Sequence, residues 1–236
     1  MKKYLNKLSY VILFLLISFY SSKVYSATAV KYVNTVYAVM LCEQGSTDTT
    51  CLNPTILGKS SGKTMDIGGA NPGAAAAAMG NTSALKFGKT YTYAQVVLDR
   101  KFQVAGSDGS CQTSATADAG TKTTFAIGKS GTGTADLQTV MIPNSTGNVD
   151  FMNGSINKDE STVGDSGAGI VADTDNYIKF RWLLAAPFTP VPGKQAQMTI
   201  AFDLSAGLDF NGTCAGARGA QHGITPGAPA ITNTFK

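Results

Sequence analysis

Four cysteines are the residues of this chain whose chemistry is easiest to assign. They are Cys42, Cys51, Cys111 and Cys214. An even number of cysteines in an exported chain predicts disulfides, and no pair has the C-x-x-C spacing of a zinc site. Sequence alone allows three connectivities, but the polar segment 43–48 indicates a loop and favours Cys42–Cys51. Cys111–Cys214 would then be the second of two expected disulfides.

A serine nucleophile is the next candidate. The segment Gly164-Asp165-Ser166-Gly167 resembles the nucleophile segment of chymotrypsin-like serine proteases. Such an enzyme needs a histidine to accept the serine proton, and in that family the histidine precedes the serine. The single histidine, His222, follows Ser166. We therefore interpret Ser166 as a turn residue and expect no catalytic site.

Two other motifs could bind ions. Asp173 and Asp175 are a weak calcium candidate, because calcium takes six to eight oxygens and this run supplies only part of that number. A solvated turn is the preferred interpretation. The segment 58–64 imitates a phosphate-binding loop but has three residues between its glycines where that loop has four. We interpret it as a loop, and we expect neither a metal nor a cofactor.

Two tyrosines are the candidate ligand-binding residues. Tyr91 and Tyr93 could project from a sheet face and stack on a sugar, although cross-strand packing explains them equally well. Asp99 and Asp203 lie on expected strands and could face each other as a glycosidase pair requires. Nothing in their spacing demands that arrangement.

Strands must position all of these residues, because the dominant hydrophobic period is two. Even positions from 92 to 104 are mainly apolar, with Arg100 as the exception that the pattern does not explain. Segments 178–184 and 198–204 alternate in the same way and are expected to form an antiparallel pair. Segment 30–42 is apolar on both faces, so it should lie centrally or be covered by another chain.

The fold class expected from these patterns is all-β. We predict a single antiparallel β-sandwich, immunoglobulin-like or jelly-roll-like, over residues 27–236. Long Gly/Ser/Thr-rich loops are expected at 105–135 and 144–176, and a short helix near 72–79, where a proline precedes five alanines. The tail from Gly207 is expected to be irregular until 230–235.

The first 26 residues have the pattern of a signal peptide. Lys2, Lys3 and Lys7 precede an apolar core at 11–17, and small residues follow, with cleavage plausible after Ser26 or Ala29. That apolar core is too short for a permanent membrane helix. The pattern predicts a bacterial protein exported to the periplasm, the cell surface or the medium.

Removing this leader changes the charge balance. The chain has 19 basic and 15 acidic residues, and four lysines but no acids lie in residues 1–26. The remainder is formally neutral and has no Lys/Arg cluster. Nucleic-acid binding needs a basic surface, so that class of partner is not expected.

Two segments resemble known families. Residues 66–98, with Asn71-Pro72-Gly73 and Gly88-Lys89-Thr90-Tyr91, resemble uncharacterised secreted bacterial β-sandwich proteins, which implies a fold but no activity. The penultimate Phe235, with Gly223 upstream, resembles the C-terminal strand of chaperone–usher pilins. That resemblance implies that segment 30–42 could act as a donor strand completing a neighbour's sheet.

The expected function is that of an exported, non-enzymatic structural or adhesive surface protein, which could self-assemble by strand addition. Its partner would be itself or another surface protein. The alternative is a soluble extracellular module that binds a glycan or another ligand through Tyr91, Tyr93 and the 144–176 loop. A carboxylate hydrolase ranks third.

Overall fold

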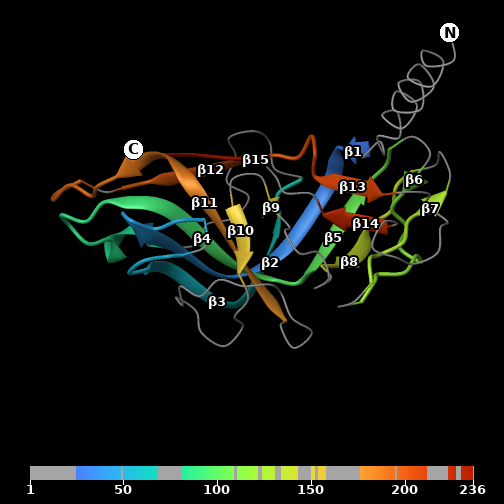
Figure 1. Ribbon diagram of the computed structural model, residues 1–236, viewed down its shortest axis with the longest axis horizontal. Coiled ribbons are helices and arrows are strands. Elements are labelled where there is room, and N and C mark those ends of the chain that lie inside the picture. The colour runs from blue at the N-terminus through green and yellow to red at the C-terminus, as the bar shows by residue number, and fades with distance from the viewer. Residues whose placement is uncertain are drawn as a thin grey trace, which may run out of the picture.

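The computed structural model describes the chain from residue 25 to residue 235 with gaps (Figure 1). The described ranges are 25–48, 50–68, 81–108, 111–121, 124–130, 134–142, 150–151, 154–157, 176–194, 196–211, 223–226 and 230–235. Within them the secondary structure is almost entirely β, with one 3-10 turn, η1, at Thr82–Ala84. The predicted all-β, antiparallel class is confirmed.

Strand β2, Ala29–Glu43, is the centre of the main sheet. It is rich in valine and tyrosine, residues that suit a strand covered on both faces. Strand β3, Thr55–Asp66, pairs along one edge of β2. The other edge is shared, with β5 (Lys101–Gly106) on the first half and β4 (Tyr91–Asp99) on the second. Both edges of β2 are therefore occupied within one chain, in the central position that the sequence predicts.

The main sheet continues outward from these strands. Its order is β8-β5-β2-β4-β11-β10-β9, with β3 attached to β2. The outer members are β8 (Gln138–Met141), β9 (Asp150–Phe151), β10 (Gly154–Asn157) and β11 (Tyr177–Phe188). Register shifts occur in β2 opposite both β3 and β4. Such bulges increase twist and bend the strands, and the sheet curls (Figure 1).

Arg100 lies where the sheet divides. It separates β4 from β5, which are otherwise one strand running along β2. Beyond this point β4 pairs with β11 and β5 pairs with β8. The Arg100 backbone N–H donates to the Asn176 carbonyl (3.0 Å), and its carbonyl accepts from the Ile142 N–H (3.1 Å). The side chain is 1% exposed and its Nε donates to the Ile142 carbonyl (2.5 Å), so the backbone and the side chain of Arg100 together hold the diverging strands at the corner.

Three small sheets pack near the main one. One has β13 (Leu208–Asn211) between β1 (Tyr25–Ala27) and β14 (Gly223–Pro226). A second joins β12 (Met198–Asp203) to β15 (Ala230–Phe235), next to β11 (Figure 1). The third is β6 (Cys111–Gln112) with β7 (Lys129–Ser130). One apolar core unites them with the main sheet, and it includes Trp182, Phe210 and Ile231.

Several features differ from the prediction. In place of the two face-to-face sheets of a sandwich, the described strands form one curled sheet with small sheets against it. The predicted helix at 72–79 lies outside the described residues. The tail is not irregular after Gly207, because β13 and β14 form there.

The predicted pairing of 178–184 with 198–204 is wrong. The edges of β11 are taken by β4 and β10, and β12 pairs instead with β15 from the end of the chain. Adjacent strands in sequence usually pair, but the proline-rich connection at 187–193 takes the chain away from β11.

We expect Arg100→Met to lower the free energy of unfolding by about 2–4 kcal/mol, because the buried Ile142 carbonyl loses a charged donor. The matched control is Lys101→Met at the neighbouring exposed position, which should change stability by less than about 0.5 kcal/mol. Urea denaturation of both variants measures this. Equal stability of the two variants would contradict the role assigned to Arg100.

Candidate functional site

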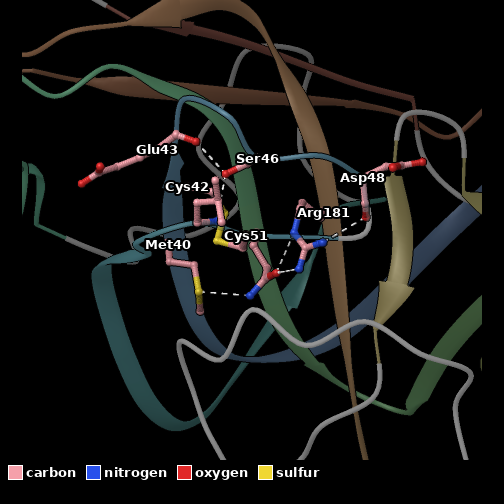
Figure 2. Close-up of a disulfide and its surroundings, with 9 residues drawn as sticks. Met40, Cys42, Glu43, Ser46, Asp48, Cys51 and Arg181 are labelled. Carbon is pink, nitrogen blue, oxygen red and sulfur yellow. Dashed lines mark hydrogen bonds between the residues drawn. A yellow bond between two sulfur atoms is a disulfide. The ribbon is translucent and has the colours of Figure 1, made fainter.

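Residues 43–54, the last residue of β2 and the loop that leads to β3, are held by a disulfide. Cys42 lies near the end of β2 and is bonded to Cys51, and both are 0% exposed (Figure 2). This pair is the one that the sequence favours, and it is confirmed. We call residues 43–54 the disulfide loop.

Polar contacts fix the inside of the disulfide loop. The Ser46 hydroxyl donates to the Glu43 carbonyl (2.6 Å) and accepts from the Leu52 N–H (2.9 Å). The Asn53 amide donates to the Glu43 carboxylate (3.2 Å). Gly45 has φ +96°, a left-handed conformation that glycine adopts without strain. The loop is therefore a defined structure, although much of its rim is exposed.

Arg181 anchors the disulfide loop to the main sheet. It lies on β11, is 0% exposed, and points toward Asp48 (Figure 2). Its Nη1 donates to the Asp48 carbonyl (3.0 Å). Its Nε (2.8 Å) and Nη2 both donate to Gln95 Oε1 on β4, and the Gln95 amide donates to the Met40 sulfur (3.2 Å). One side-chain network thus links β2, β4, β11 and the disulfide loop.

Burial changes the pKa of this arginine. It lowers the pKa of Arg181 to about 10, while the electrostatic interactions with Asp48 and Tyr93 oppose that shift. Arg181 therefore remains a cation at neutral pH, held by amide and carbonyl oxygens. A buried charge of this kind costs free energy unless its hydrogen bonds are complete. The network therefore ties the disulfide loop to β11 and β4 through hydrogen bonds.

A second polar group lies on the same sheet. The Tyr37 hydroxyl donates to the Asp99 carboxylate (3.4 Å), and the Tyr37 ring meets Tyr177 edge to face with centroids 4.6 Å apart. Burial first, and then the Asp99 charge, raise the pKa of Tyr37. Asp99 also accepts from the Lys101 N–H (2.7 Å). Its carboxylate thus serves local hydrogen bonds.

The candidate ligand-binding tyrosines differ in exposure. Tyr91 is 0% exposed, and its hydroxyl contacts the Thr55 hydroxyl (3.0 Å) and accepts from the Lys86 N–H (3.1 Å). Its ring offers no face to a sugar. Tyr93 is partly buried and close enough to Arg181 to influence its pKa. The pair does not form an aromatic platform.

Other candidate residues lie partly beyond the described ranges. Cys111 is buried and not a free thiol, but its expected partner Cys214 lies outside the described residues. One disulfide is thus described where two were expected, and Cys111–Cys214 stays a prediction. The calcium candidates Asp173 and Asp175, together with Ser166 and His222, also lie outside. Among the described residues no group of three metal-ligating side chains gathers.

The segment 58–64, which resembles a phosphate-binding loop in sequence, is not a loop. Residues 58–64 lie inside strand β3, where the Ser60 hydroxyl donates to the Val36 carbonyl (2.8 Å) and accepts from the Gly62 N–H (3.1 Å). The expected loop is therefore wrong at this position. The glycine serves a bulge, because Gly62 has φ +112° against the Tyr37 ring.

The residues that sequence reasoning missed are Gln95 and Arg181. The alternating pattern assigned both to a solvent-facing side, yet both are fully buried. The signal was present in segment 30–42, because Met40 and Ala38 are apolar on that side and form a second cluster with Val97. When a central strand is apolar on both faces, other parts of the protein must cover both faces of the sheet there, and residues of the neighbouring strands are then buried on both faces as well.

Comparisons with protein-family models, with curated proteins and with solved structures find no match for this chain. The part of the chain that the structure describes holds no helix with the length and apolar character needed to cross a membrane.

We expect Arg181→Met to destabilise the fold by about 2–4 kcal/mol, because Gln95 Oε1 is left buried without its donors. The double variant Arg181→Met/Gln95→Leu should lose less than the sum of the two single variants. Leu183→Ser, at an exposed position of the same strand, is the control and should have little effect. Urea denaturation measures the free energy of unfolding of the two single variants, the double variant and the control. Strictly additive losses of stability in the double variant would exclude the network.

Proposed function

We propose that this chain is an exported, non-enzymatic surface protein of a bacterium with a structural or adhesive role. The observation that carries the proposal is the buried Cys42–Cys51 disulfide. Structural disulfides persist in oxidising compartments and are rare in the cytosol. The signal-peptide pattern of residues 1–26 supports the same compartment independently.

The use of the polar side chains supports a scaffold role. Arg100 and Arg181 are buried and hold strands or the disulfide loop, as described above. Asp203 accepts from the Ser205 N–H, which lowers its pKa, and Asp99 bonds Tyr37. Among the described residues, the two carboxylates proposed as a glycosidase pair, Asp99 and Asp203, are thus engaged in local hydrogen bonds. The glycan-binding alternative also loses Tyr91, which is buried.

Export is tested by expressing the full chain in a bacterial host and fractionating the cells. We expect the protein in the periplasm or medium, without its leader and with no reactive thiol under denaturing conditions. Mass spectrometry before and after alkylation measures both properties. Retention in the cytoplasm with four alkylated cysteines would overturn the proposal.

Assembly by strand addition would have to avoid β2 and β3. Both edges of β2 are occupied. The outer edge of β3 carries the exposed Lys59 and Lys63 next to register shifts, and charges and bulges protect edges from pairing. A donor role for segment 30–42 therefore has no support in this arrangement.

Strand β12 is the edge that fits strand addition. Among the described strands it is hydrogen bonded only to β15, which itself meets β11 through the stacked rings of Phe235 and Phe188 (4.0 Å). Its side chains are partly exposed, and its one charge is at Asp203, the last residue. Long apolar edges without charges favour pairing with another strand.

We expect the purified protein to associate in a concentration-dependent way, and Ala201→Lys in β12 to weaken that association at least tenfold. A lysine on an edge strand opposes strand pairing. Ser61→Lys, at an exposed position of β3, is the matched control and should associate like the unmodified protein. Sedimentation velocity measures the three proteins. An unmodified protein that stays monomeric at tens of micromolar would contradict the proposal that the protein self-assembles.

A further inference from the structure

The leader and the fold meet between Tyr25 and Ala29. Sequence patterns leave two cleavage positions open, after Ser26 and after Ala29, since both residues are small. By motif alone the second is at least as good, because Ala27 and Ala29 give the A-x-A pattern. The structure separates the two positions, because the first lies before Ala29 and the second lies after it, and Ala29 is built into the core.

Ala29 belongs to the folded protein. It is 4% exposed, it is the first residue of β2, and it pairs with Gly106 on β5. Its backbone N–H donates to the Leu204 carbonyl (3.2 Å). A chain starting at Val30 would lose this hydrogen bond and this buried methyl group.

Two glycines leave room for this segment. A Cβ atom on Gly207 would lie 3.0 Å from the Ala29 Cβ. A Cβ atom on Gly106 would lie 2.9 Å from the Thr28 carbonyl oxygen. Both distances are shorter than ordinary van der Waals contact, so side chains at these positions would displace Thr28 and Ala29. The fold is therefore shaped around Thr28 and Ala29.

Tyr25 and Ser26 lie in the three-residue strand β1. Among the described strands β1 pairs only with β13, where these two residues lie opposite Phe210 and Asp209. Strand β13 keeps its other partner, β14, along all four of its residues. Removing Tyr25 and Ser26 takes two backbone pairs from a short edge and leaves Ala27 opposite Leu208.

We propose that maturation cleaves the peptide bond between Ser26 and Ala27, so that the exported protein begins at Ala27. A leader peptidase that selects small residues would catalyse the reaction, and water is the co-reactant. Water adds across the amide, leaving a carboxylate on Ser26 and an α-ammonium group on Ala27. The inference deepens the proposed function and rests on it, because without export no leader is removed.

The intact mass and N-terminal peptide of the exported protein test this directly. We expect residues 27–236. A protein that starts at Val30, or at any residue other than Ala27, overturns the cleavage position while leaving export in place. The uncleaved 236-residue chain found inside the cell overturns the proposed function itself, so the two failures are distinguishable.

Two variants, one on each side of the proposed cleavage position, give a matched comparison. Ser26→Leu puts a large residue before the proposed cut and should abolish the Ala27 N-terminus, whereas Ala29→Leu should still yield it. Processing is scored on total cell protein after a short pulse, so a folding defect in Ala29→Leu does not affect the result. Normal processing of Ser26→Leu, or a block in Ala29→Leu, would overturn the proposal.

Discussion

The fold depends on how one long strand shares its edge. Strand β2 has fifteen residues, and neither β4 nor β5 alone can satisfy the backbone groups along its second edge. The chain solves this with one bent strand that is interrupted at Arg100. The interruption lets β11 and β8 leave in different directions, which curls the sheet. The buried Arg100 guanidinium donates to the Ile142 carbonyl at this divergence, and an unpaired carbonyl in the interior would be costly.

The same device appears on the other face of the sheet. Arg181 carries its charge into the space between β11 and the disulfide loop, and Gln95 and the loop backbone accept its hydrogen bonds. The disulfide restricts the unfolded chain, while the arginine specifies where the closed loop rests. The two constraints act on different states of the molecule. Together they hold the disulfide loop against one face of the main sheet.

Local patterns in the sequence predicted much of this structure. Alternation identified the buried faces of Trp182 and Leu98, and apolar character on both faces identified β2 as central. Short separation identified Cys42–Cys51. The failures were non-local. Pairing of β12 with β15 depends on which edges are already occupied, and burial of Tyr91 depends on Thr55 and Lys86 closing over its hydroxyl. Arg100 interrupted the apolar alternation without an apparent cause. The cause is the divergence of four strands at this residue, and these strands are too far apart in the sequence for a local pattern to reveal it.

Maturation and edge protection are connected in this fold. In the full chain β13 has a partner on each side, and removal of Tyr25 and Ser26 would leave Phe210 and Asp209 paired only with β14. Export under our proposals would thus open part of the β13 edge in addition to the edge of β12, and would do so only outside the cytoplasm. The two edges differ in kind. The edge on β13 is short and still blocked at Leu208 by Ala27, which limits it to brief contacts. Strand β12 offers six consecutive residues, so lasting contacts between copies would form there and not at the site of cleavage.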